Sequence, residues 1–152
     1  MYVEKEPEAL IRDFHRQNMF LACHPLVTIV AHPWWWHGKW IDPDGKYRTK
    51  PWFEDFSVIP ASLHDEFAAA VKENGKIVEI NLWAMLLTHA YEESFKRQYL
   101  EYLAGLKSRG VKFSIGSDTH EGKYQVDLVE SARRLDSVGI TEQDLWTLPA
   151  RV

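Results

Sequence analysis

Residues 111–120 read Val-Lys-Phe-Ser-Ile-Gly-Ser-Asp-Thr-His, a short apolar run followed directly by polar residues. The run from Val111 to Ile115 has the length and composition of a buried strand. Asp118 and His120 are two positions apart, so in extended chain their side chains point to the same face, roughly 7 Å apart. Both side chains can therefore reach one metal ion or two adjacent ions. Gly116 is expected to let the backbone turn closely beside such a site.

On both sides of this segment, the apolar spacing predicts helices alternating with strands. Helices are expected over 6–17, 62–73, 92–108 and 124–138, and strands over 26–31, 76–81 and 111–115. Ser62, with Asp65 three positions later, is the expected N-cap of the second helix, and a short capped segment is expected from Thr141. In a parallel α/β fold with right-handed crossovers, the carboxyl ends of all strands meet at one edge. The sequence therefore predicts an α/β fold of parallel βα units, with one domain spanning residues 1–152.

The other two expected strands also end in residues that can bind metals or substrates. His32 closes the first strand, and Glu79 and Asn81 share one face of the second. A half-buried histidine is the simpler interpretation of His32 alone, and a salt bridge is as plausible as a functional role for Glu79. Convergence with Asp118 and His120 at one edge favours a metal site assembled from distant residues.

Four of the seven tryptophans lie within seven residues, Trp34, Trp35, Trp36 and Trp40, in the long segment that follows the first strand. The simplest expectation is that these rings pack this segment onto the fold. Two alternatives remain open: one or two rings line a substrate pocket, or the rings mark a subunit interface. His37 lies beside them and is a candidate auxiliary group.

The composition narrows the classes of protein that fit. A net charge of −4 without a basic stripe argues against nucleic-acid binding. The single cysteine, Cys23, excludes an internal disulfide and a cysteine-based zinc cage, and fits a reducing compartment. The first ten residues lack a signal-peptide pattern, and no apolar run reaches membrane-spanning length. A cytoplasmic protein without a membrane partner is expected.

The segments Ile29-Val-Ala-His-Pro33, Val78-Glu-Ile-Asn81 and Ile115-Gly-Ser-Asp-Thr-His120 together resemble the C-terminal half of the PHP (polymerase and histidinol phosphatase) domain. The resemblance begins near Pro25 and implies part of a distorted, TIM-like (β/α)7 barrel. It also implies divalent metal ions (zinc, manganese or iron) and hydrolysis of a small-molecule phosphoester. By this match the metal ligands are His32, Asp118 and His120. Glu79 and Asn81 match a strand that lines the family's site. Trp34, Trp35 and His37 are candidates for the substrate side because they follow the first strand.

The sequence departs from that family in one important respect. The family begins with a His-x-His motif, and none of the seven histidines here forms one. We therefore expect either a homodimer or a missing N-terminal half-barrel to complete the fold, because a half-barrel leaves open sheet edges. Two other hypotheses stay open: a truncated, non-catalytic remnant or interaction module of such a barrel, and hydrolysis of amide substrates at a similar metal site.

Overall fold

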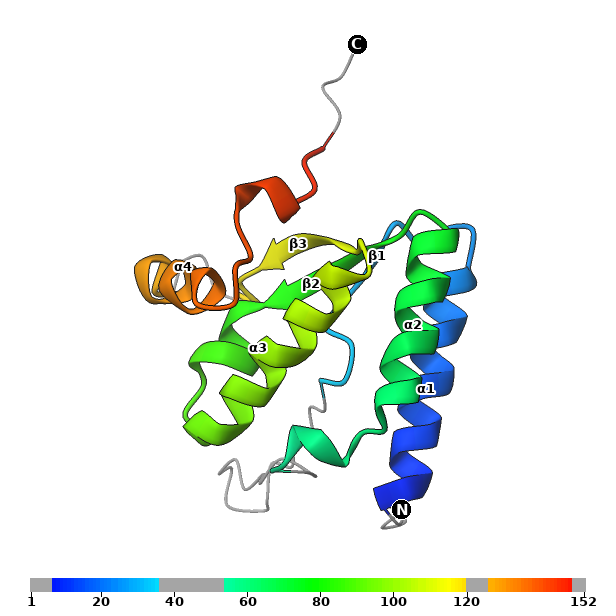
Figure 1. Cartoon of the computed structure of the whole chain (residues 1–152), viewed down its shortest axis with the longest axis horizontal. Coiled ribbons are helices and arrows are strands. Elements are labelled where there is room, and N and C mark those ends of the chain that lie inside the picture. Colours follow the sequence, from blue (N-terminus) through cyan, green and yellow to red (C-terminus); the bar gives the residue numbers. More distant parts are fainter. Residues whose placement is uncertain (1–6, 36–53, 120–125, 149–152) are drawn as a thin grey trace.

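A computed structural model of the chain describes residues 7–35, 54–119 and 126–148 (Figure 1). The elements run in the order α1 (Pro7–Cys23), β1 (Ile29–Val30), η1 (Phe56–Val58), α2 (Ala61–Glu73), β2 (Ile77–Asn81), η2 (Leu82–Leu87), α3 (Glu93–Ser108), β3 (Lys112–Gly116), α4 (Leu128–Asp136) and η3 (Glu142–Asp144). The predicted alternation of helices and strands is therefore confirmed over the described residues.

The three strands form a parallel sheet in the order β1-β2-β3. Ile29 and Val30 pair with Ile77 and Val78, and β2 continues in register with β3 up to the pair Asn81–Gly116. All three carboxyl ends therefore lie at one edge, as the crossover argument predicts. The fold class, α/β with parallel βα units, is confirmed. The described sheet is open, and a closed barrel is not seen in it.

The chain continues the sheet beyond β3 with a short contact. Leu145 bridges to Phe113 in the parallel sense, and the Trp146 N–H donates to the Phe113 carbonyl at 2.7 Å. The capped turn before this contact is held by Asp144, whose carboxylate accepts the Thr141 N–H at 2.9 Å. This is the short capped segment that the sequence predicts from Thr141.

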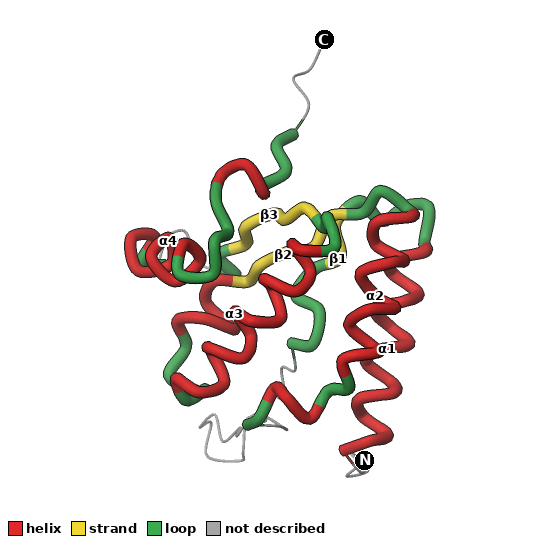
Figure 2. Tube along the Cα trace, in the orientation of Figure 1, coloured by secondary structure: helices red, strands yellow, loops and turns green. Residues whose placement is uncertain are grey.

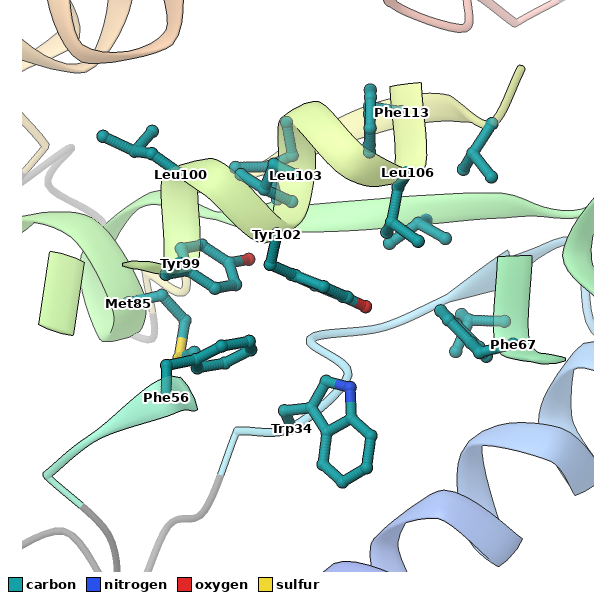
Figure 3. Packing of buried hydrophobic residues seen from close by; sticks show 14 of the residues in the cluster. Trp34, Phe56, Phe67, Met85, Tyr99, Leu100, Tyr102, Leu103, Leu106 and Phe113 are labelled. Atoms are coloured by element: carbon teal, nitrogen blue, oxygen red, sulfur yellow. The ribbon is translucent and has the colours of Figure 1, made fainter. Parts of the chain in front are cut away.

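Helices α1, α2 and α3 lie along one side of the sheet, and α4 lies near the end to which the strand arrows point (Figures 1 and 2). The core is the apolar layer between the sheet and these helices (Figure 3). Its largest fully buried side chains include Trp34, Tyr99, Phe67, Phe95 and Phe113. Burying apolar surface of this kind is the main favourable contribution to folding.

Three local expectations were wrong. Helix α1 extends to Cys23, six residues beyond its expected end, because no glycine or proline stops it before His24. Helix α2 begins at Ala61 after Pro60, without a side-chain cap, so Ser62 is inside the first turn rather than its cap. In α4, the helical spacing of Leu128, Val129, Ala132 and Leu135 indicates one apolar face for packing, but Leu128 and Val129 are exposed.

Across the part of the chain that the structure describes, no helix is both long and apolar enough to cross a membrane.

Candidate functional site

The candidate site is the edge of the sheet where β1, β2 and β3 end. His32 follows β1 after one residue, Glu79 and Asn81 lie in the central strand β2, and Asp118 follows β3 after one residue. The register pairs Glu79 with Ser114 and Asn81 with Gly116, so the polar residues of β2 lie between the two flanking strand ends. The structure therefore brings His32, Glu79, Asn81 and Asp118 to the same edge.

The backbone at this edge is strained. His32, Trp34 and Asp118 have φ angles of 31°, 69° and 53°, in the left-handed region that residues other than glycine rarely adopt. Such a conformation costs about 1–3 kcal/mol per residue and is concentrated at functional sites. Two of these three residues, His32 and Asp118, are predicted metal ligands that follow different strands.

Glu79 links the ends of β1 and β3. Its Oε2 accepts the backbone N–H of His32 at 2.8 Å. Its other oxygen, Oε1, lies only 1.9 Å from where a Cβ on residue 116 would stand. Any side chain larger than hydrogen at position 116 would therefore collide with the carboxylate. Gly116 is required for this close approach: it lies inside the regular ladder of β3, and its φ is outside the left-handed region. The close approach of Glu79, and not the backbone turn that the sequence suggested, therefore explains the glycine at position 116.

The oxygen and the nitrogen of the Asn81 side-chain amide have different surroundings. Its Oδ1 accepts the N–H of Ala84 at 2.8 Å and so caps the single π-helical turn η2. Its Nδ2 is buried and has no hydrogen-bond partner, and the same holds for Oγ1 of Thr119. Buried polar atoms in proteins are nearly always paired. Within the described residues, the edge thus holds two buried polar groups that remain able to bind a ligand or water.

The aromatic residues after β1 divide between the edge and the core. Trp35 packs its ring edge-on against the His32 imidazole, with centroids 4.6 Å apart. Trp34 instead is fully buried, 5.8 Å from the His64 ring and 6.4 Å from the His15 ring (Figure 3). Trp35 therefore lies beside a predicted ligand, whereas Trp34 forms part of the interior between the helices. The simplest expectation, that these rings pack the segment onto the fold, describes Trp34 well.

The interior around Trp34 is unusually polar for a core. Four polar atoms here are buried without a hydrogen bond of normal geometry: the hydroxyls of Tyr99 and Tyr102, Nε1 of Trp34 and Nδ1 of His64. The Tyr99 hydroxyl approaches the Asn81 backbone, and the Tyr102 hydroxyl approaches the Trp34 indole. Burial lowers the pKa of His64 to about 4, so its imidazole is neutral at pH 7. Burial also raises the pKa of Tyr99, and the nearby Glu79 carboxylate raises it further. Both tyrosines therefore remain protonated behind the site.

The metal ligands expected from the sequence are only partly described. His120 and His37 lie outside the described residues. Among the residues that are described, no group of three His, Cys, Asp or Glu side chains is placed to hold one metal ion. His32 and Asp118 supply imidazole and carboxylate donors of the kind that zinc, manganese and iron accept. A metal site built on these two donors would need at least one further ligand from outside the described residues.

The sequence alone missed two features of the edge. The π-helical turn η2 was not expected, although an asparagine directly before an apolar run is a recognisable capping signal. The contact between Glu79 and Gly116 was not expected either, because it depends on the register of two strands 30 or more residues apart.

Comparison with known proteins adds no relative: no protein-family model, curated protein or solved structure matches the chain. The resemblance to the PHP domain therefore stays a prediction.

Proposed function

We propose that this chain carries the strand-end half of a divalent-metal site in a hydrolase of the phosphoesterase type. The observation that carries the proposal is the pair His32 and Asp118. Both follow parallel strands at the same edge, and both have left-handed backbones. Strain of this kind is retained where a side chain must be aimed at a ligand.

In this proposal His32, Asp118 and His120 hold the ion, which is zinc, manganese or iron. The bound ion supplies the chemistry of lowering the pKa of water and polarising a phosphoryl oxygen. The chain's own residues bind and orient. The buried Asn81 amide and the Thr119 hydroxyl have free hydrogen-bonding capacity for an oxygen-rich substrate. The Trp35 ring restricts the His32 imidazole from one side.

The proposal extends to the architecture. An open parallel sheet with helices on one side has the form of a sector of a TIM-like barrel, and the Leu145–Phe113 bridge adds the start of a further strand. We propose that additional polypeptide, either a second copy or an N-terminal half-barrel, pairs with β1 and supplies the remaining ligands. The cytoplasmic location and the absence of a nucleic-acid partner stay predictions.

Metal content and catalysis test this function together. The purified chain is expected to bind Mn²⁺ or Zn²⁺ and to hydrolyse an aryl phosphate, with both properties weakened by Asp118→Ala and by His32→Ala. Asp136→Ala, a change of an exposed residue at the end of α4, is the matched control and should alter neither property. Unchanged metal binding in both site variants would refute the assignment. Hydrolysis of an amide but not of the phosphate would favour the amidohydrolase alternative.

Two observations favour a second candidate, an interaction module without catalysis. The described residues by themselves do not form a three-ligand metal group, and within them the outer edge of β1 is unpaired while Ile29 is exposed. Unpaired edges attract other strands. Sedimentation of the chain at increasing concentration, with and without Mn²⁺, separates the candidates: association without any metal binding supports the module.

A further inference from the structure

The geometry points to Glu79 as the positioning residue of this edge. We infer that its carboxylate holds His32 in its left-handed conformation and fixes the distance between the ends of β1 and β3. Position 116 is a glycine because a Cβ there would occupy the space of this carboxylate. The inference deepens the proposed function and rests on it for the role of His32.

The first step is the position of Glu79 in the sheet. It is the only acidic residue of β2, the central strand of the described sheet, and the observed register pairs it with Ser114 of β3. The residues of β2 on the same face as Glu79, Ile77 and Asn81, are both buried. A carboxylate in such surroundings is costly unless hydrogen bonds satisfy it.

The second step is where the two carboxylate oxygens go. Oε2 accepts the His32 N–H at 2.8 Å, a hydrogen bond between residues 47 positions apart. Oε1 occupies the space that a side chain at position 116 would fill. The side chain therefore touches the backbone of both flanking strand ends at once.

The third step connects these contacts to the predicted ligands. The N–H that Glu79 accepts belongs to His32 itself, and Gly116 is two residues before Asp118. A charge-assisted hydrogen bond can hold the otherwise unfavourable φ of 31° at His32. Glu79 thus acts on the site through the backbone, without being required to bind the metal.

The test separates the hydrogen bond from the charge. Glu79→Gln keeps an oxygen that can accept the His32 N–H, whereas Glu79→Ala removes it. Loss of a group that orients a metal ligand typically weakens metal binding by about 10–100-fold. We therefore expect Glu79→Ala to raise the dissociation constant for Mn²⁺ by about tenfold or more. Glu79→Gln should bind Mn²⁺ with nearly the wild-type dissociation constant.

A second measurement does not depend on metal at all. Hydrogen exchange of the His32 amide in the metal-free protein should accelerate by about tenfold in Glu79→Ala and remain slow in Glu79→Gln, because only the first variant loses the acceptor. Glu73→Gln, a change of an exposed residue of α2, is the matched control and should affect neither measurement.

The outcomes are distinguishable. Equal loss of Mn²⁺ binding in Glu79→Gln and Glu79→Ala would overturn the inference, since it would show that the charge acts directly on the ion. Unchanged His32 exchange in Glu79→Ala would also overturn it. A wild-type chain that binds no Mn²⁺ would overturn the proposed function, while the exchange of the His32 amide would still decide whether Glu79 positions that residue.

Discussion

Replacing Gly116 with alanine should force the Glu79 carboxylate out of its place. The new Cβ would lie 1.9 Å from Glu79 Oε1, about 1.5 Å short of the 3.4 Å at which ordinary van der Waals contact begins. It would also lie 2.7 Å from Cδ, so rotation of the carboxylate alone does not relieve the collision. A displacement of that size disturbs the geometry of the 2.8 Å hydrogen bond from the His32 N–H, which lies on the β1 side of Glu79.

The expected cost is about 1–3 kcal/mol of unfolding free energy, the usual range for overpacking a filled site. A hydrogen bond to a charged group contributes a similar amount, about 1.5–3 kcal/mol. Without the collision, Gly→Ala at a position with an ordinary φ would instead stabilise the protein by about 0.4–1 kcal/mol, through the entropy of the unfolded chain. A loss of stability in Gly116→Ala would therefore indicate the collision with the Glu79 carboxylate, and a gain in stability would indicate that there is no collision.

Urea unfolding followed by circular dichroism measures the effect in two backgrounds. Gly116→Ala should destabilise the wild-type chain but be neutral or stabilising together with Glu79→Ala, which gives a coupling energy of about 1–3 kcal/mol. Gly105→Ala in α3 is the control, because its Cβ meets only the flexible end of Arg109, at 3.3 Å. Equal destabilisation of both backgrounds by Gly116→Ala would refute the reasoning, as would no destabilisation in either.

Three further predictions concern the core and the helices. Trp34→Ala should cost about 3–5 kcal/mol by chemical denaturation, because the ring is fully buried, whereas Trp83→Ala, at a residue 42% exposed, should cost clearly less. Because burial lowers the pKa of His64 from 6.5 to about 4, the unfolded chain binds a proton more readily between these values. Stability should therefore fall as the pH drops from 6.5 towards 4, and denaturation curves of His64→Phe should show a smaller fall over the same range. Asp127→Ala should cost about 1 kcal/mol in the same denaturation assay, since Asp127 caps α4 by accepting the Glu130 N–H at 2.9 Å; no measurable change would contradict the capping role.

The order of the elements could be predicted because it depends on local patterns. The spacing of Phe95, Tyr99, Leu103 and Leu106 predicts one buried face of α3, and all four side chains are buried. The same reasoning failed for Leu128 and Val129 in α4, which are exposed. Periodicity shows which residues share a face, but whether another element covers that face depends on the packing of the whole chain.

The residues at the strand ends could be found from the sequence for a related reason. Parallel strands joined by right-handed crossovers present their carboxyl ends together, so His32 and Asp118 were expected at one edge, and they lie there. The positions of the side chains in the segments that follow the strands could not be predicted in this way. Trp34 and Trp35 are adjacent in sequence, yet one lies in the core and the other beside His32, because the left-handed backbone at Trp34 turns the chain between them.

The sequence by itself determined the alternation of helices and strands, the parallel sense of the sheet and the polar character of its carboxyl edge. Only the tertiary structure decided how that edge is held together. The contact of Glu79 with His32 and Gly116 joins residues 47 and 37 positions apart. Such a contact is fixed by strand register and by the absence of a single Cβ, and neither is encoded in the pattern of any one segment.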